Sequence, residues 1–391
     1  MKLSILHNAY QSIGPSGENE VVNQEFSRLQ KIAPDVQLIL ANSDKIFSGS
    51  LLWKIRLTLQ SVLFGYPTIT SQQRKRIAAS DVVHLHNSFP AFGFNIVKNL
   101  KKRQKYVVMS IHNARLSCLN GSHSYAGKAC FRCVDKRYFA SGVIRGCYRQ
   151  SKFQSLLYSR YTRLFLRDFH LVDHFIVLNF FSFQKLIDLG VSDKRISIRP
   201  TICDGPSKTY DPQEKGLLFA GRLTEEKGVD LLIQAWVEST APKNGWKLYI
   251  AGEGPLRKRL ESKFSPADGV IFLGMLSEEK ISEAIRNCRI VCVPSKSFEG
   301  FPSLISKSAA NGRPVVISNV GPLAELSGLD WITSLAAEVE VWREYFNTLN
   351  QDNYSYKNLS ARDWWEREAS PSRADSNLLK IYEDLKMRKL R

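Results

Sequence analysis

The sequence predicts an α/β protein of two domains, each built on a parallel β-sheet. Three observations support this. Short apolar strands alternate with amphipathic helical segments along the chain, which is typical of parallel sheets joined by helical crossovers. The series of strands stops near residue 200 and then starts again. The length of 391 residues exceeds what one ordinary hydrophobic core supports and suits two domains.

Six strands are expected in the first half, over residues 3–7, 36–40, 82–86, 107–112, 175–178 and 196–199. Five follow in the second half, over residues 217–220, 248–251, 270–273, 290–293 and 315–318. A polar stretch near residues 203–213 separates the two series and has the composition of a linker. We therefore predict a first domain at residues 1–203 and a second at 204–391. Apolar residues on one face of residues 372–390 predict a terminal helix.

The net charge of +18 is concentrated in the first half. Residues 1–200 hold 29 Lys and Arg against 11 Asp and Glu, whereas residues 201–391 hold 26 of each. Such an asymmetry indicates an anionic partner for the first domain, either a membrane surface, a phosphorylated acceptor or nucleic acid. The simpler alternative is a solvated basic face.

Composition also bears on the cellular compartment. No run of 18 apolar residues occurs, so no transmembrane helix is expected. The start enters a strand pattern directly and lacks the apolar core of a signal peptide, which predicts a cytoplasmic protein. Seven cysteines fit reduced thiols or a metal site better than a disulfide framework.

A first chemical motif follows the strand at residues 217–220. Gly221 and Arg222 come at its end, and Lys227 stands five residues after Arg222 at the start of a helical pattern. This spacing puts two cations at the carboxyl edge of a parallel sheet, where such sheets bind ligands. Arginine binds a diphosphate through two hydrogen bonds and lysine acts as a point charge. Taken alone, the motif would more simply be a solvated loop.

A second motif lies in residues 294–304. Pro302 suits the first position of a helix, and Gly312 suits its end. The loop before Pro302 would bring backbone N–H groups and the positive end of the helix to the sheet edge, which favours phosphate. Glu299 precedes this helix and can accept hydrogen bonds from sugar hydroxyls. In isolation it would more simply cap the helix.

Together with four further stretches, these motifs resemble the retaining glycosyltransferases of family 4, the glycosyl transferases group 1. Residues 14–18 resemble the glycine-rich first loop of that family, and residues 81–87 its Asp-Ile-Val-His-x-His-Asn strand. Residues 110–113 resemble the strand end that carries the active-site histidine, and residues 252–255 the loop that holds the nucleotide base. The resemblance covers nearly the whole chain and implies the GT-B fold, two facing Rossmann-like domains with the active site between them.

The resemblance also implies the reaction and its residues. The donor would be a UDP- or GDP-sugar, the anomeric configuration would be retained, and no catalytic metal would be needed. Arg222 and Lys227 would neutralise the leaving diphosphate, Glu299 would bind the donor sugar, and His112 would contact the sugar near the reacting carbon. Further donor and phosphate contacts are expected at Gly14, Gly17, Gly221, Gly254, Gly300, Phe301, Pro302, Ser303 and Lys307.

One of these positions departs from the family pattern. A second glutamate, eight positions after the first, usually holds the ribose hydroxyls, and Lys307 stands there in this sequence. A lysine cannot accept a hydrogen bond. The nucleoside of the donor is therefore left open.

Histidines and cysteines of the first half could be either structural or functional. We expect His84 and His86, which alternate on one strand, to face opposite sides, so that at least one of them is structural. The insertion at residues 113–150 carries Cys118, Cys130, Cys133 and Cys147. Four thiols have the ligand count of a structural zinc site, although the outer spacings equally allow ordinary reduced cysteines.

Cations interleave with apolar and aromatic residues over residues 51–57, 98–105 and 148–167. This pattern suits a surface that lies on anionic lipid. We therefore expect a glycan or lipid-linked acceptor of cell-surface polysaccharide synthesis, handled at the inner face of the membrane, and no nucleic acid. Two alternatives stay open: a nucleic-acid-binding protein with a zinc module, and another two-Rossmann enzyme such as a sugar-nucleotide epimerase or a phosphorylase.

Overall fold

Two units make up the chain in the computed structural model, which describes residues 1–9, 17–42, 55, 58–126, 128–134, 139–207, 212, 215–349 and 355–387. Unit 1 comprises Met1–Ser122, Phe131–Arg199 and Ala374–Arg391, and unit 2 comprises His123–Cys130 and Pro200–Arg373. The terminal helix α15 (Pro371–Met387) thus falls mostly in unit 1, not in the second domain at 204–391 as predicted from sequence order. Its Leu378, Tyr382 and Leu385 are buried against the sheet of unit 1.

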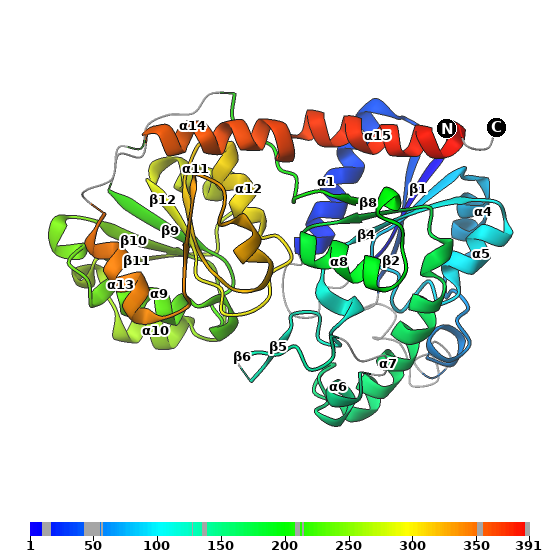
Figure 1. Ribbon diagram of the computed structural model, residues 1–391, viewed down its shortest axis with the longest axis horizontal. Helices are drawn as coiled ribbons and strands as arrows, with labels where there is room; N and C mark the ends of the chain where they lie inside the picture. Colours follow the sequence, from blue (N-terminus) through cyan, green and yellow to red (C-terminus); the bar gives the residue numbers. More distant parts are fainter. Residues whose placement is uncertain are drawn as a thin grey trace. The chain divides into compact units, whose positions relative to one another are not determined.

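The sheet of unit 1 has six parallel strands in the order β2-β1-β3-β4-β7-β8 (Figure 1). Their bounds are β1 Leu3–Ala9, β2 Val36–Asn42, β3 Val82–Leu85, β4 Tyr106–Ile111, β7 His174–Val177 and β8 Ile196–Ile198. All six predicted strands of this half are confirmed to within two residues at each end. The chain order reverses between β1 and β3, and the carboxyl ends of strands at such a switch point are where open sheets bind ligands.

Helices cover both faces of this sheet because successive strand residues point to opposite sides. Leu3 and Ile5 of β1 pack with α1 (Gly17–Ile32) and α15 on one face. Leu6 lies in the core of the other face. The helices on that face are α4 Ser71–Ala79, α5 Ile96–Lys102 and α8 Phe180–Asp188.

Two further helices come after β4: α6 (Ala140–Ile144) lies within the insertion at residues 113–150, and α7 (Lys152–Arg167) follows it (Figure 1). The insertion also holds a two-stranded hairpin that the sequence did not predict, β5 (Ser124–Tyr125) with β6 (Lys128–Ala129).

Unit 2 repeats the plan with the strand order β11-β10-β9-β12-β13-β14. The strands are β9 Gly216–Ala220, β10 Lys247–Ala251, β11 Val270–Gly274, β12 Ile290–Val293, β13 Val315–Ser318 and β14 Ile332–Leu335. The five predicted strands are confirmed, and the edge strand β14 was missed. The switch point of this sheet lies between β9 and β12.

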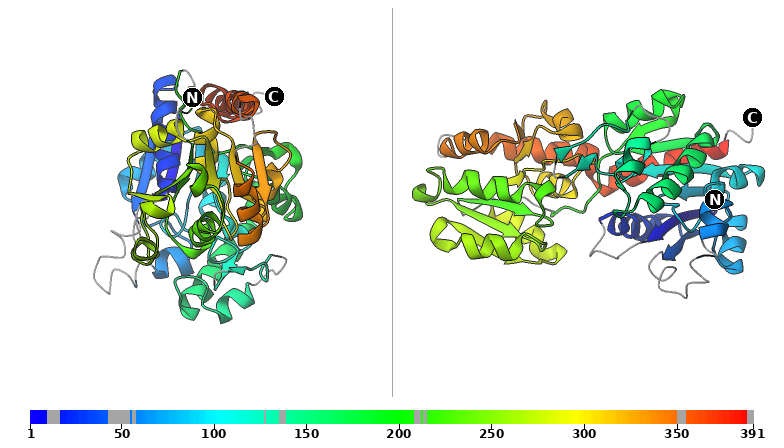
Figure 2. Two further views of the ribbon diagram at one scale, coloured as in Figure 1. Left: turned by 90° about the vertical axis from the view of Figure 1, so that its left-hand side faces the viewer. Right: turned by 90° about the horizontal axis from the view of Figure 1, so that it is seen from below.

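Figure 2 shows helices on both faces of the second sheet. One face is covered by α9 Val229–Val237, α10 Arg257–Lys263 and α13 Val339–Asn347. The other is covered by α11 Glu278–Asn287, α12 Ser303–Ala310 and α14 Ser355–Trp364. Short 3-10 and π turns complete the elements: η1 Thr58–Leu63, η2 Ala114–Leu116, η3 Phe169–Leu171, η4 Asp193–Arg195, η5 Glu225–Lys227, η6 Pro242–Asn244, η7 Pro266–Asp268, η8 Gly321–Leu326 and η9 Trp365–Ala369. Within the described ranges, no helix is both long and apolar enough to span a bilayer.

Candidate functional site

The switch point of unit 2 brings the two predicted donor motifs together. Strands β9 and β12 are neighbours, with Leu218 in register with Val291, so their carboxyl ends meet at one edge. Gly221 and Arg222 follow β9, and the loop that carries Glu299 follows β12. Residues about 75 positions apart in the chain therefore share one sheet edge.

Lys227 and Glu299 form an ion pair at this edge. The hydroxyl of Ser295 donates to the same carboxylate oxygen of Glu299 at 2.8 Å. The side chain of Arg222 is 60% exposed, and its guanidinium lies 3.9 Å from the carboxylate of Glu226. This edge thus holds two cations, which could bind phosphate, and one carboxylate, which could accept hydrogen bonds from sugar hydroxyls.

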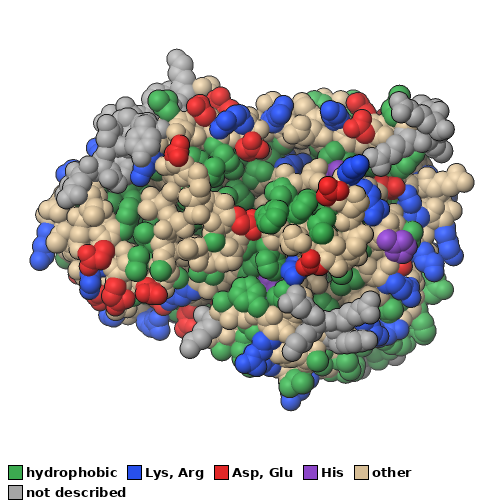
Figure 3. Space-filling model, in the orientation of Figure 1, with side chains coloured by type: hydrophobic (Ala, Val, Ile, Leu, Met, Phe, Trp, Pro, Cys, Tyr) green, Lys and Arg blue, Asp and Glu red, His purple; other side chains and the backbone are tan. Residues whose placement is uncertain are grey.

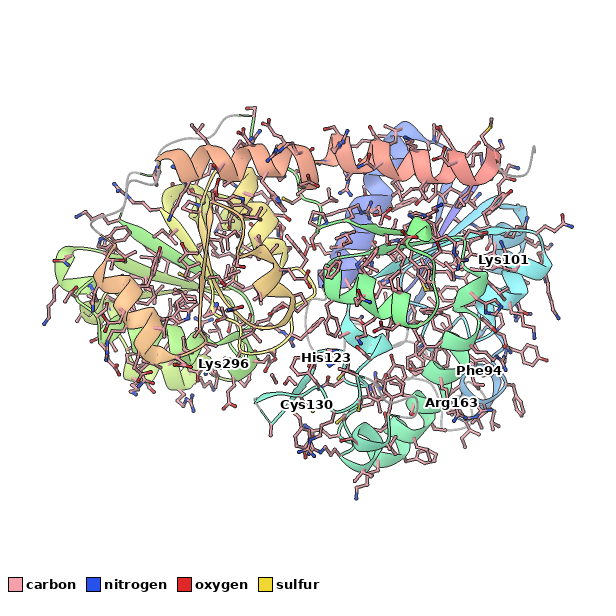
Figure 4. All side chains as sticks on the ribbon, in the orientation of Figure 1. Phe94, Lys101, His123, Cys130, Arg163 and Lys296 are labelled. Carbon is pink, nitrogen blue, oxygen red and sulfur yellow. The ribbon has the colours of Figure 1, made fainter. Side chains whose placement is uncertain are left out.

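Backbone contacts fix the loops that carry these side chains. Gly228 has a φ of +70°, and a Cβ there would overlap the carbonyl oxygen of Pro294. The amide of Lys296 donates to the carbonyl of Glu226 at 2.9 Å, and its ammonium pairs with Asp230 at 2.9 Å (Lys296 is labelled in Figure 4). The loop after β9 and the loop after β12 are therefore held against each other.

The loop after β10 packs on the same segment. Gly252 has a φ of +131°, and a Cβ on it would overlap the carbonyl of Gly221. A Cβ on Gly254 would overlap the backbone of Leu223, whose amide donates to the Glu253 carbonyl at 2.8 Å. Close backbone approach alone therefore explains both glycines, and a contact of Gly254 with the donor stays a prediction.

The segment Gly300, Phe301, Pro302 and Ser303 leads into helix α12. Pro302 was predicted at the first position of the helix. The helix begins at Ser303 instead, so Pro302 lies one position before it. The Phe301 carbonyl accepts a hydrogen bond from Thr201 at 3.0 Å, and its ring stacks on Trp364 with centroids 6.0 Å apart. These contacts fix the start of α12, where the amide of Ile305 donates to the carbonyl of Pro302 at 3.0 Å.

Lys307, one turn into α12, is paired with Glu278 at the first position of α11. The lysine side chain is only 13% exposed and the glutamate side chain 47%. Position 307 is therefore cationic, but a carboxylate of the neighbouring helix lies against it. Sequence analysis missed Glu278, because no local pattern links residues 29 positions apart.

Unit 1 has a pocket of about 550 Å³, its open mouth included, at the carboxyl ends of β3 and β4. Its polar lining includes Glu18, His86, His112, Asn113 and Arg115. Its aromatic lining comprises Phe89, Tyr158, Tyr161, Phe165 and Phe169. The predicted residue Gly17 begins α1 beside Glu18, whereas Gly14 lies outside the described residues.

His112 stands at the end of β4 as predicted, and it lines this pocket. Burial, reinforced by the neighbouring His86, lowers the pKa of His112 to about 4. The ring is therefore neutral at neutral pH. Its Nε2 lies 2.8 Å from Nδ1 of His86, and the two rings stack with centroids 5.0 Å apart.

The prediction that His84 and His86 face opposite sides is wrong. Both approach the same oxygen of Glu25, Oε1, with His84 Nδ1 at 3.4 Å and His86 Nε2 at 3.2 Å. Residues two apart on a strand point to the same face, which is the physical reason. His86 lines the pocket, whereas His84 and Glu25 on α1, which is 1% exposed, do not.

Glu25, His84 and His86 offer the ligand types of a zinc site, and their three ligand atoms lie within 4.8 Å of one another. The local charge is already balanced, however, because Arg199 pairs with Glu25. Burial would raise the pKa of Glu25, but Arg199 and the histidines outweigh it and hold that pKa well below its usual range. An additional divalent cation would leave buried charge without compensation.

The predicted zinc ligands Cys118, Cys130, Cys133 and Cys147 are all free thiols. Within the part of the chain that the structure describes, they form no group of three ligand atoms within 4.8 Å. Cys118 donates to Asn120 at 2.8 Å, and Cys133 and Cys147 pack beside Leu119 in a small apolar cluster. The structural zinc site at these four cysteines therefore stays a prediction.

Residues 214–345, within unit 2, match the family model described as glycosyl transferases group 1. An uncharacterised glycosyltransferase of Methanocaldococcus jannaschii is 36% identical over 116 residues, 29% of each chain. A GDP-mannose-dependent phosphatidylinositol dimannoside mannosyltransferase of Mycobacterium tuberculosis is 33% identical over 146 residues, 37% of this chain and 38% of that protein. The chain spans less than half the length of these curated relatives.

Solved structures extend the similarity to nearly the whole fold. Anabaena HepE in complex with UDP aligns over 98% of this chain and all of its own, with a TM-score of 0.64 and 13% identity. The lipopolysaccharide outer core galactosyltransferase WaaB aligns over 98% of this chain and all of its own, with a TM-score of 0.62 and 15% identity. Two α/β units on parallel sheets, matching these proteins, make this the GT-B fold.

Proposed function

We propose that the chain is a retaining, metal-independent glycosyltransferase that moves a sugar from a nucleoside diphosphate to a glycan or lipid-linked acceptor. The observation that carries the proposal is the juxtaposition of Arg222, Lys227 and Glu299 at the switch point of unit 2. These three residues lie in the segment that matches the glycosyltransferase family model. Cations suited to phosphate and a carboxylate suited to sugar hydroxyls meet there within one unit.

The residues fit the charge that develops during transfer. The bond from the anomeric carbon to the diphosphate oxygen breaks, and a bond to the acceptor oxygen forms on the same face. The acceptor proton passes to the departing phosphate oxygen. Arg222 and Lys227 stabilise the negative charge on that leaving group, and preorganised charges of this kind account for most of the rate enhancement in many enzymes. Glu299 orients the sugar by accepting from its hydroxyls.

The identity of the nucleotide is supported from two directions. HepE was solved with UDP, and the mycobacterial relative is named as GDP-mannose-dependent. We therefore propose a UDP- or GDP-sugar donor. Lys307, paired with Glu278, stands where a ribose-binding carboxylate would be expected, and we propose that Glu278 accepts from the ribose hydroxyls in its place.

The acceptor side of the proposal rests on unit 1. One face of α7 places Tyr158 and Tyr161 in the pocket. Its other face exposes Phe153 (68%) and Leu156 (55%), followed at helical spacing by Arg160, Arg163 and Arg167. Exposed apolar residues near α7 comprise Ile144, Phe64 and Tyr66. Figure 3 shows hydrophobic side chains beside Lys and Arg at the edge of unit 1 where α6 and α7 lie.

Apolar side chains flanked by arginines suit an anionic lipid surface. A membrane there would present a lipid-linked acceptor close to the pocket, whose polar and aromatic linings suit an amphiphile. We propose on this basis that the enzyme acts at the inner face of the membrane in cell-surface polysaccharide synthesis.

A thermal-shift screen against UDP-, GDP- and dTDP-sugars tests the donor assignment. A ligand at 100 times its dissociation constant stabilises the folded protein by about 2.7 kcal/mol. The stabilising donor is then incubated with and without a lipid-linked acceptor in the presence of EDTA, and the anomeric configuration of the product is read by NMR. Conversion of the donor sugar without acceptor would indicate an epimerase instead. Binding to random DNA that persists at physiological salt, without any donor binding, would favour the nucleic-acid alternative.

A further inference from the structure

A buried chain of hydrogen-bonding groups runs from the core of unit 1 to its pocket. It begins at Glu25 on α1, passes through His86, and ends at His112, which lines the pocket. Two of its atoms, Glu25 Oε1 and His86 Nε2, are buried and form no hydrogen bond of regular geometry among the described residues. They lie 3.2 Å apart, so each is the partner left to the other.

The acceptor end of the chain is fixed by charge. Arg199 donates to Oε2 of Glu25 and helps hold its pKa well below the usual range against the effect of burial. Glu25 is therefore ionised at neutral pH, and an ionised carboxylate only accepts hydrogen bonds. Whatever group faces its other oxygen must supply a proton.

His84 does not supply that proton. Burial raises the pKa of the Tyr382 hydroxyl well above its ordinary value, so the hydroxyl keeps its proton. It lies 2.7 Å from Nδ1 of His84, while Nε2 of His84 lies 2.8 Å from the hydroxyl of Ser110. Burial also keeps His84 neutral by lowering its pKa well below the usual value. Because Nδ1 of His84 lies 2.7 Å from the Tyr382 hydroxyl but 3.4 Å from Glu25, the tyrosine is its nearer partner, and His86, at 3.2 Å, is the nearer donor for Glu25.

We propose that Glu25 is a positioning residue that determines which ring nitrogen of His112 carries the proton. With the proton of His86 on Nε2, toward Glu25, its Nδ1 offers a lone pair. Nε2 of His112 must then donate across the 2.8 Å contact. His112 is left with a bare Nδ1, a hydrogen-bond acceptor for a hydroxyl of the bound sugar or acceptor.

The catalytic consequence of this inference rests on the proposed function, whereas the proton positions do not. Nitrogen-15 NMR of the histidine rings distinguishes the two neutral tautomers, so the proposal can be tested without any substrate. In the wild-type protein His86 and His112 should both carry their proton on Nε2. A proton on Nδ1 of wild-type His112 would overturn the proposal.

The variant Glu25→Gln should invert this pattern. Arg199 can only donate, so it retains the amide oxygen of the introduced glutamine and turns the NH₂ group toward His86. Nε2 of His86 must then accept, its Nδ1–H donates to His112, and the proton of His112 moves to Nδ1. The matched control is Asp375→Asn, which removes a carboxylate paired with Arg28 between α15 and α1 but touches neither histidine. The control should leave both tautomers unchanged.

The effect of Glu25 on catalysis is tested by measuring kcat. Once a donor has been found, Glu25→Gln should lower kcat by roughly 10²-fold, the scale of one misplaced hydrogen-bonding group at a reacting centre. The control Asp375→Asn should stay within a few-fold of wild type at a similar melting temperature. Inverted tautomers with wild-type kcat would refute the positioning of a reacting group by Glu25. A wild-type protein that transfers no sugar, but whose tautomers are as described, would remove the proposed function and leave the proton chain standing.

Discussion

The ammonium of Lys227 donates to the carboxylate of Glu299 at the carboxyl edge of the second sheet. Two side chains assigned to different parts of a nucleotide sugar are therefore joined to each other. A diphosphate would compete for the lysine, and a sugar hydroxyl would compete for the glutamate. Since the Ser295 hydroxyl also donates to Glu299, the carboxylate keeps one partner when the lysine turns to phosphate.

We predict that Arg222→Ala and Lys227→Ala each lower turnover by roughly 10²–10³-fold, because each removes a preorganised charge from the leaving group. Glu299→Gln should abolish transfer, since an amide of the same size cannot replace the carboxylate. The measurement is kcat with the donor identified by the thermal-shift screen. The control is Lys243→Ala, an exposed cation at η6, which precedes β10 at the other end of the strands. Wild-type rates in both Arg222→Ala and Lys227→Ala would remove the leaving-group assignment.

A charge exchange tests the pair formed by Lys307 and Glu278. Lys307→Glu alone places two carboxylates together and should lower the free energy of unfolding by up to about 1 kcal/mol, the scale of a partly exposed ion pair. Adding Glu278→Lys should restore stability and leave a carboxylate at position 307. We expect this double variant to bind UDP- or GDP-sugars more tightly than the wild type in titration calorimetry. Unchanged affinity in the double variant, with stability restored, would show that position 307 does not face the donor.

Membrane binding is expected to depend on the outer face of α7. The wild-type protein should sediment with anionic vesicles and be released as salt rises, because each surface cation contributes about 1 kcal/mol that salt screens. The double variant Phe153→Ser, Leu156→Ser should bind less at every salt concentration. Leu359→Ser, which removes an equally exposed apolar side chain from unit 2, serves as control. Equal binding of the protein to neutral and anionic vesicles would contradict the prediction.

Gly252→Ala should destabilise unit 2 by about 1–3 kcal/mol, since the φ of +131° suits only glycine and the added Cβ overlaps Gly221. Gly245→Ala is the matched control, with a φ of +79° and no atom within 4 Å of the new Cβ. It should lower the free energy of unfolding by about 1–2 kcal/mol, the cost of the left-handed backbone alone, and so by less than Gly252→Ala. Urea denaturation followed by tryptophan fluorescence compares the two. A larger loss in Gly245→Ala than in Gly252→Ala would refute the clash.

The depressed pKa of His112 predicts a specific dependence of stability on pH. Its pKa is about 4 in the folded protein, from an ordinary value of 6.5. As pH falls, this histidine is protonated in the unfolded chain before it is protonated in the folded protein. The free energy of unfolding should therefore decrease as pH falls from about 6.5 to about 4. His112→Asn should reduce the dependence of the melting temperature on pH over this window to the part left by His84 and His7, whose pKa values burial also lowers, whereas the exposed His170→Asn should not change it. A wild-type slope in His112→Asn would contradict the assignment.

The sequence determined the features that depend on short stretches of chain. Eleven strands could be located because each is a local apolar run bounded by turn residues, and the cations at residues 222 and 227 could be placed at a sheet edge because they follow one such run. The edge strand β14 escaped because only four residues, Ile332–Leu335, form it and its burial is partial. The opposite orientation expected for His84 and His86 was an error of strand geometry, not a limit of the sequence.

Tertiary structure decided everything that joins distant segments. Arg199 reaches Glu25 across 174 positions, and Tyr382 reaches His84 across 298. No pattern in the sequence records these pairs, because the order of strands in a sheet and the docking of a terminal helix determine which side chains meet. For the same reason, α15 packs on the first sheet although it follows the last strand of the second. Its apolar face is encoded locally, but the surface that buries it exists only after the first sheet has formed.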